Sequence, residues 1–249
     1  FVQNMKDYRE LSRKVHQAAP RLKRIEPINT FDFGDDLDVW VPVLHCLDNF
    51  YESYKNAQRS GKELWYYTCN NPWSGFYLNR GLDYPLTHMR LLHWFNYRYN
   101  LTGYLHWGYN QWYMDDPFGK PEQGEIAAPG DAFIVYPGKN GPLNSIRWEA
   151  QRDGLEDFEY LWVLGEKMKK LKARFGKAAE DFDPTQRGKE LCNQLITSMH
   201  QIDYDPVQFR KARAKIAQEI LNTDMEQAAL VWTFPLDGTE LTRGSAVIQ

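Results

Sequence analysis

Several features that identify common classes of protein are scarce or missing in this chain of 249 residues. No run of about 18 apolar residues occurs, so no membrane-spanning helix is expected. The 3 cysteines form neither a CxxC nor a mixed Cys/His spacing, so neither a disulfide framework nor a metal site is expected. Neither a Gly-rich phosphate loop nor a GxSxG turn is present, and we expect no cofactor. With 30 basic and 33 acidic residues, the chain has no cationic surplus for nucleic acid.

Aromatic residues, in contrast, are abundant. They make up 15% of the chain, with 9 Trp, 15 Tyr and 13 Phe, whereas the hydrophobic and charged fractions of 43% and 25% are ordinary for a globular protein. Such a composition excludes a mostly disordered chain. The aromatic excess indicates either an aromatic-rich core or a cleft lined with flat ring faces.

The apolar pattern of the first 110 residues alternates between the helical and the strand period. It predicts helices over 4–19, 49–60 and 85–100, an extended segment over 22–29, and strands over 37–47, 63–69 and 103–110. Strands that alternate with helices favour a parallel sheet with helices outside it, which is the α/β class. Four strands fit either half of a (β/α)8 barrel or a small open sheet.

After residue 110 the pattern no longer alternates between strands and helices. Residues 111–145 form a long loop rich in Gly, Pro and Asp, and a long helix is predicted over 145–170. Two further helices follow near 185–201 and 206–222. The tail over 229–249 changes to alternating polarity around an Asp237-Gly238 turn, which predicts a β-hairpin.

In parallel α/β folds, ligands lie beyond the carboxyl ends of the strands. Asn70 follows the strand over 63–69, and Tyr109, Asn110 and Trp112 end or follow the strand over 103–110. Amides beside aromatic faces suit sugars, because rings stack on CH faces and amides bond hydroxyl groups. The alternative is that these aromatic side chains fill the core.

Glycoside cleavage usually needs two carboxylates. On topology, Asp115 and Asp116 are the best-placed pair, because they lie just beyond the last predicted strand. The alternative for this pair is an ordinary turn. His88 and His93 lack the i, i+4 spacing of a helical metal pair.

Four stretches follow one another in an order and at distances typical of one known family. They are WYYTC followed by Arg90 and Trp94, then GYLHWGYNQW, GDAFIVYPG and SIRWEAQRDGLEDFEYL, which begin at Trp65, Gly103, Gly130 and Ser145. Over roughly residues 1 to 170, this series resembles the catalytic domain of glycoside hydrolase family 123, also called the glycoside-hydrolase-like domain of unknown function 4091.

The resemblance implies a (β/α)8 TIM barrel and retaining, substrate-assisted cleavage of N-acetyl-β-galactosaminides. In that mechanism the acetamido oxygen of the sugar attacks its own anomeric carbon, an Asp orients the acetamido group, and the adjacent Glu protonates the leaving oxygen. The substrate-binding side carries over to Trp65, Tyr67, Asn70, Trp107, Tyr109, Asn110 and Trp112. For Arg147, Arg152 and Asp153 we expect helix-anchoring ion pairs instead.

The chain departs from the family pattern in one respect. No Asp-Glu dipeptide occurs, and the family's pair belongs at the end of a fourth barrel strand, about where Phe1 begins. We therefore expect residues 1–170 to be the C-terminal half of a glycosidase-like barrel, 171–228 a helical extension, and 229–249 a hairpin tail that starts a further β domain. No catalytic residue is assigned within the chain.

Two functions remain open from the sequence. One is a β-N-acetylhexosaminidase-like glycoside hydrolase whose catalytic pair lies upstream, and the other is a non-catalytic carbohydrate-binding or structural module. In either case we expect a carbohydrate partner, and preceding residues or another chain to complete the barrel. The resemblance also implies an exported bacterial protein, periplasmic or extracellular.

Overall fold

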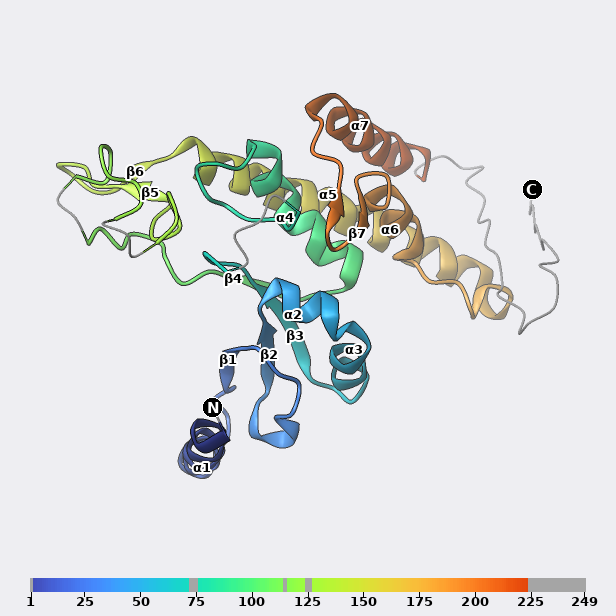
Figure 1. Ribbon diagram of the computed structural model, residues 1–249. Helices are drawn as coiled ribbons and strands as arrows, with labels where there is room; N and C mark the ends of the chain where they lie inside the picture. Colours follow the sequence, from blue (N-terminus) through green and yellow to red (C-terminus); the bar gives the residue numbers. More distant parts are fainter. Residues whose placement is uncertain (1, 72–75, 114–115, 124–126, 224–249) are drawn as a thin grey trace.

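The computed structural model describes residues 2–71, 76–113, 116–123 and 127–223. The fold is mixed α/β, as the alternating pattern predicts, and is built on a parallel sheet in the order β1-β2-β3-β4 (Figure 1). Its strands are β1 (Ile25–Ile28), β2 (Val39–Pro42), β3 (Glu63–Tyr67) and β4 (Gly103–Leu105). The helices of this part are α1 (Val2–Ala18), η1 (Gly34–Asp36), α2 (Leu44–Asn49), α3 (Tyr51–Arg59) and α4 (Leu86–Tyr99).

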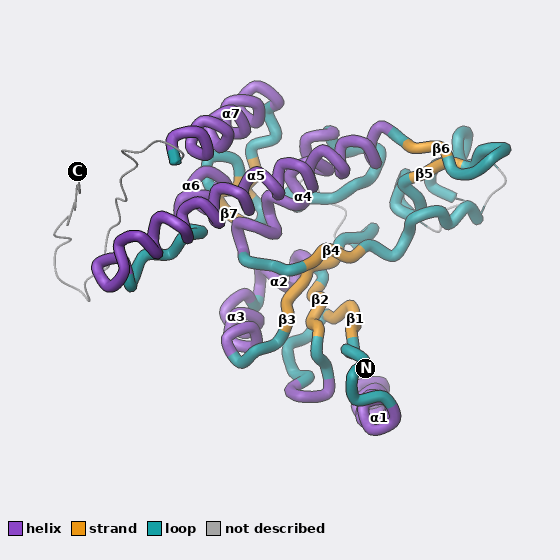
Figure 2. Tube along the Cα trace, turned by 180° about the vertical axis from the view of Figure 1, so that it is seen from behind, coloured by secondary structure: helices purple, strands orange, loops and turns teal. Residues whose placement is uncertain are grey.

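The second half of the chain is mostly helical and lies beside α4. Its elements are the β5 (Val135–Tyr136) and β6 (Leu143–Asn144) hairpin, α5 (Ile146–Phe175), η2 (Gly176–Ala179), α6 (Gln186–Cys192), the β7 (Ile196–Ser198) and β8 (Gln201–Ile202) hairpin, and α7 (Pro206–Asn222). Figure 2 shows α5 crossing α4 and the β5-β6 hairpin projecting beyond β4. No helix in the described ranges is both long and apolar enough to cross a membrane.

The two faces of the sheet have different surroundings. Leu64 and Tyr66 of β3 are buried on the face covered by α2, α3 and α4, and the Tyr66 hydroxyl donates to the carbonyl of Leu92 at 2.8 Å. Trp65 and Tyr67 alternate to the other face and are only half-buried. The figures show no described helix over β3 on that second face. A parallel sheet normally has both faces covered.

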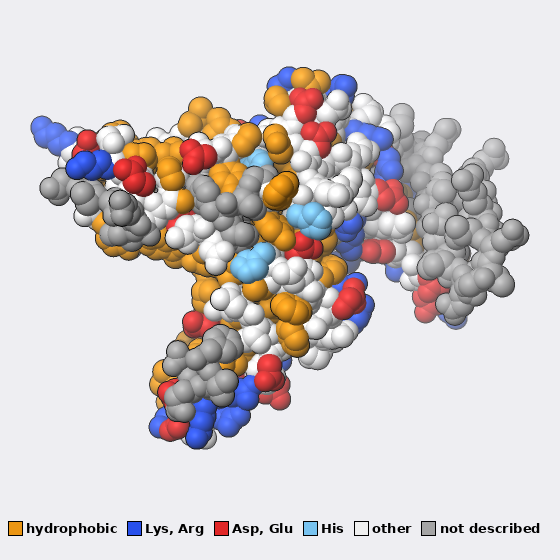
Figure 3. All heavy atoms as spheres, in the orientation of Figure 1, with side chains coloured by type: hydrophobic (Ala, Val, Ile, Leu, Met, Phe, Trp, Pro, Cys, Tyr) orange, Lys and Arg blue, Asp and Glu red, His pale blue; other side chains and the backbone are white. Residues whose placement is uncertain are grey.

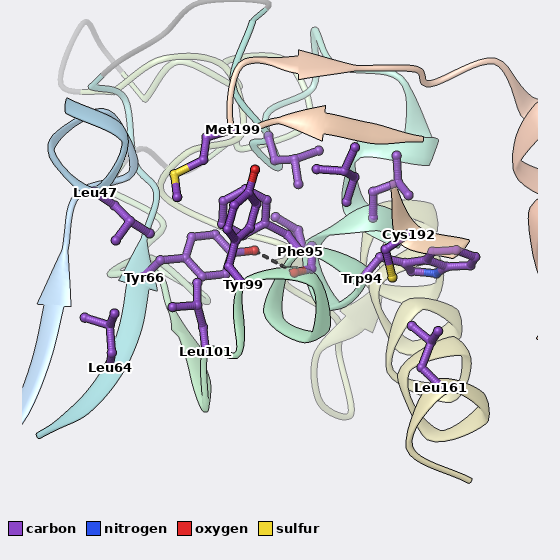
Figure 4. Packing of buried hydrophobic residues seen from close by; sticks show 14 of the residues in the cluster. Leu47, Leu64, Tyr66, Trp94, Phe95, Tyr99, Leu101, Leu161, Cys192 and Met199 are labelled. Carbon is purple, nitrogen blue, oxygen red and sulfur yellow. Dashed lines mark hydrogen bonds between the residues drawn. The ribbon is translucent and has the colours of Figure 1, made fainter. Parts of the chain in front are cut away.

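One hydrophobic core joins the sheet to the helical layer. Figure 4 shows Tyr66 of β3 packed among Phe95, Tyr99 and Leu101, with Trp94 and Leu161 continuing the core toward α5. A buried ion cluster adds to this packing through two short contacts. Asp157 of α5 accepts from Arg90 of α4 at 2.8 Å and from Arg213 of α7 at 2.6 Å.

Several element boundaries differ from the sequence-based prediction. The strand predicted over 37–47 ends at Pro42, because Leu44 and Leu47 turn into α2 and are fully buried on one side of that helix. The last predicted strand is shorter and spans only Gly103–Leu105. The helix predicted near 185–201 ends at Cys192, and a β-hairpin follows. The predicted hairpin over 229–249 lies outside the described residues.

Candidate functional site

Aromatic rings gather where the carboxyl ends of β3 and β4 meet. Tyr67 is the last residue of β3, and His106 directly follows β4; their ring centroids are 6.3 Å apart. The His106 ring stacks on Trp107 at 6.5 Å and 17°, and Trp107 stacks on Tyr113 at 6.3 Å and 24°. We call Tyr67, His106, Trp107 and Tyr113 the aromatic row. Its outer members are accessible, because Trp107 is 37% exposed and Tyr113 is 51% exposed.

A buried carboxylate fixes two rings of this row. The Oδ2 atom of Asp131 accepts from Nε1 of Trp107 at 2.7 Å, and its Oδ1 accepts from Nε2 of His106 at 3.1 Å. The backbone N–H of Gly108 donates to Nδ1 of His106 at 3.2 Å, so the imidazole carries its proton on Nε2. Burial and the charge of Arg80 lower the pKa of His106 to about 4. His106 is therefore neutral near pH 7.

Arg147 of α5 holds the loop that supplies Asp131. Its Nη1 donates to the carbonyls of Arg80 at 2.7 Å and Gly130 at 2.9 Å, and its Nη2 donates to that of Phe133 at 2.8 Å. Gly130 has φ of +77°, and a Cβ there would lie 2.7 Å from the Arg147 guanidinium. One buried side chain thus ties the loop after β3 to the loop around Asp131.

The ion pair expected for Arg147 is not found among the described residues; Arg147 anchors its helix through backbone carbonyls instead. The expected ion pairs are found for its two neighbours. Arg152 pairs with Glu149 at 2.6 Å, and Asp153 pairs with Arg90 of α4 at 3.5 Å.

A second arginine, Arg80, lies in the loop that Arg147 holds. It is 4% exposed, and its Nε and Nη2 atoms are buried with no hydrogen-bond partner in the described chain. Burial, together with the charge of Arg147, lowers the pKa of Arg80 to about 10, so the guanidinium still carries its charge at neutral pH. The same Nη1 atom of Arg147 donates to the carbonyls of Arg80 and Gly130, so Arg80 lies beside the loop that supplies Asp131 to the aromatic row.

The structure brings two of the predicted sugar-binding residues, Tyr67 and Trp107, into the aromatic row. Tyr109 is 44% exposed and turns toward α5, where its ring meets Trp148 edge-on at 5.5 Å. Asn70 and Asn110 are exposed, in the loops after β3 and β4. Hydrophobic side chains are visible at the surface where β4 meets the β5-β6 hairpin (Figure 3).

Trp65 and Trp112 lie elsewhere. The Trp65 ring packs on Gly103, and its Nε1 donates to Glu63 at 2.9 Å, which places it toward the amino end of β3. Trp112 donates to the carbonyl of Val135 at 3.0 Å and packs against Phe133 in a small separate core. The Trp65 ring thus packs between β3 and β4, and Trp112 attaches the loop after β4 to β5.

His106, Asp131 and Arg80 were not among the residues selected from the sequence. Asp131 lies inside the GDAFIVYPG stretch, so that motif was the available signal. Of the two carboxylates that were selected, Asp115 lies outside the described residues. The side chain of Asp116 is exposed and accepts from the backbone N–H groups of Phe118 at 3.2 Å and Gly119 at 3.0 Å. Asp116 thus forms the ordinary turn that was the alternative for this pair.

Comparison with known proteins agrees with the family resemblance. The family model described as "Glycoside hydrolase 123, catalytic domain" matches residues 2–164. That match covers well over half of the chain, and the chain belongs to glycoside hydrolase family 123. A search of curated proteins found no match.

A solved structure shows the same fold. It is a family 123 glycoside hydrolase from Clostridium perfringens, determined in a study of glycolipid glycan hydrolysis. The similarity has a TM-score of 0.53 and 18% sequence identity, and covers 80% of this chain and 34% of that one. The present chain therefore corresponds to about a third of the length of that hydrolase.

Proposed function

We propose that this chain is part of a retaining, substrate-assisted glycoside hydrolase for N-acetyl-β-galactosaminides, and that the aromatic row binds the sugar. The family supports glycosidase chemistry. The placement of the sugar on the aromatic row rests on Trp107. Its indole is accessible and is oriented by a 2.7 Å hydrogen bond to Asp131. A ring held in one orientation can stack on the CH face of a sugar without further ordering.

Asp131 serves in this proposal as a positioning residue. It is fully buried, and its two oxygens are engaged by His106 and Trp107, so neither is free to meet a substrate. Because the chain has no Asp-Glu dipeptide, we assign the acetamido-orienting Asp and the proton-donating Glu to residues outside it. The reaction would then proceed by attack of the sugar's own acetamido oxygen, with the aromatic row holding the ring.

The proposal includes completion of a (β/α)8 barrel by preceding residues or by another chain. Two features support it. In the described residues, β1 and β4 each have a strand partner on one side only. The face that carries Trp65 and Tyr67 is partly exposed, and Ile25 at its margin is 42% exposed. In keeping with the family resemblance, we also propose that the protein is exported.

The alternative function is a non-catalytic carbohydrate-binding module, which the missing Asp-Glu pair favours. The deciding experiment is release of nitrophenol from 4-nitrophenyl N-acetyl-β-galactosaminide by the protein expressed from its complete coding sequence. We expect turnover that Trp107→Ala reduces at least tenfold, with Trp162→Ala, an exposed tryptophan of α5, as the control. Sugar binding without any turnover would support the module and contradict the hydrolase.

A further inference from the structure

The guanidinium of Arg80 has hydrogen-bonding capacity that the described chain does not use. Its backbone is fixed, since its N–H donates to Asn79 Oδ1 at 2.8 Å and its carbonyl accepts from Arg147 at 2.7 Å. In the side chain, Nε and Nη2 are enclosed without an acceptor, and Nη1 is the one guanidinium nitrogen that is not enclosed in this way. The backbone of Arg80 is thus fixed, and its guanidinium has no hydrogen-bond partner in the described residues.

Burying an unpaired cation is unfavourable, and native structures pair such groups. No carboxylate in the described residues lies within 4.0 Å of Arg80. Asp131, the carboxylate of this cluster, already accepts from His106 and Trp107. Arg147 supplies a second positive charge, so the cluster of Arg80, Arg147 and Asp131 carries one positive charge in excess.

We propose that Arg80 binds an anionic oxygen substituent, a carboxylate or a sulfate ester, on the sugar held by the aromatic row. The Nη1 nitrogen, which is not enclosed, can donate charge-assisted N–H bonds to an oxygen of either group. The excess positive charge of the cluster would be neutralised by a ligand of this kind. The inference rests on the proposed function and narrows its substrate class to acidic glycans.

Calorimetric titration of the protein expressed from its complete coding sequence tests this assignment. The sulfate arm compares N-acetylgalactosamine 6-sulfate with N-acetylgalactosamine, and the carboxylate arm compares glucuronic acid with glucose. Inorganic sulfate measures the contribution of charge alone. We expect the acidic sugar of at least one arm to bind tenfold or more tightly than its neutral counterpart, and more tightly than inorganic sulfate.

The variant Arg80→Gln removes the charge and keeps a polar side chain. It should abolish the preference for the acidic sugar and leave the melting temperature unchanged or higher, because an unpaired buried cation is lost. Arg210→Gln, which removes an exposed arginine of α7, should keep the preference.

Three results would overturn the assignment. They are equal affinity for acidic and neutral sugars, a preference that persists in Arg80→Gln, and a lowered melting temperature in Arg80→Gln, which would show that Arg80 is paired within the protein. Binding of neutral sugars without any preference would leave the proposed function standing. Failure to bind any of the sugars would contradict both.

Discussion

At the scale of single residues, Asp131 orients two rings through its two oxygens. Oδ1 accepts from His106 and Oδ2 accepts from Trp107, with distances of 3.1 and 2.7 Å. A hydrogen bond to a charged group contributes about 1.5–3 kcal/mol, enough to hold each ring in one orientation before a ligand arrives. The site therefore depends on an aspartate that lies far along the chain from the strand ends it serves.

The sequence identifies the aromatic members of this site better than its polar ones. Tyr67 and Trp107 were selected through the family resemblance, and they lie where the carboxyl ends of two neighbouring parallel strands share one edge. Asp131 and Arg80 were not selected, since their place depends on Arg147, which bonds a carbonyl 67 residues away. Contacts of that separation have no local pattern from which they could be read.

Three buried histidines make the stability of the fold depend on pH. Burial lowers the pKa of His88, His93 and His106 to about 4. The unfolded chain then binds more protons than the folded one between about pH 4 and pH 6.5, so the free energy of unfolding falls as the pH is lowered through that range. Each histidine can contribute up to about 2 kcal/mol to the loss between pH 7 and pH 5.

Urea denaturation at pH 7 and pH 5 measures this dependence. His93→Gln removes one of the three groups, so the variant should lose less stability between the two pH values than the parent protein does. His16→Gln, which changes an exposed histidine of α1, should leave the loss unchanged. An equal loss in His93→Gln and the parent would show that His93 does not titrate as its burial requires.

At the scale of elements, the crossing of α4 and α5 depends on glycine. By helix propensity alone, Gly154 and Gly165 would weaken α5. The structure instead uses Gly154 for close packing, since a Cβ at this position would lie 2.5 Å from the carbonyl oxygen of Arg90. At Gly165 the nearest group is the Tyr97 hydroxyl, at 3.1 Å.

These two glycines form a matched pair for mutation. Helix propensity alone favours alanine over glycine by about 1 kcal/mol at each position. Because of the backbone contact, Gly154→Ala should instead destabilise the protein by about 1–3 kcal/mol. Gly165→Ala should be near neutral, since a side-chain hydroxyl can move. Thermal melting of both variants gives the comparison, and equal melting temperatures would contradict this account of the helix crossing.

The apolar pattern of α5 also shows a property that the sequence does not predict, which is how much of a helix face is covered. Leu161 and Leu164 are fully buried, whereas the apolar side chains of Ile146, Leu155 and Trp162 are between 49% and 69% exposed. Leu155 and Trp162 line an open groove of about 690 Å³ between α4, α5 and β4. Periodicity shows which residues share a helix face, but not how much of that face a neighbour covers.

The boundary between β2 and α2 is a second feature that the sequence pattern does not predict. The stretch LDVWVPVLHCL is apolar throughout because both the strand and the helix after it are buried, so its composition does not mark the boundary. Pro42, which has no N–H to donate, is the residue at which the strand ends.

At the scale of the whole molecule, the order of strands and helices along the sequence predicts the sheet topology. The topology in turn determines where the strand ends meet, and the candidate site lies there. The predicted alternation of strands and helices produced a parallel sheet in sequence order, with helices on one face. In such a sheet, ligands bind beyond the edge that is formed by the carboxyl ends of the strands. The aromatic row, its buried aspartate and the unpaired arginine all lie at that edge in this protein.

The most direct test of this account is calorimetric titration of N-acetylgalactosamine into the protein expressed from its complete coding sequence and into its Trp107→Ala and Trp162→Ala variants. By analogy with stacking of bases on aromatic side chains, Trp107→Ala should weaken binding by about 1–3 kcal/mol. Trp162→Ala should leave the affinity unchanged. Unchanged affinity in Trp107→Ala, together with a lower melting temperature, would assign Trp107 to the core and contradict a carbohydrate site at the carboxyl edge.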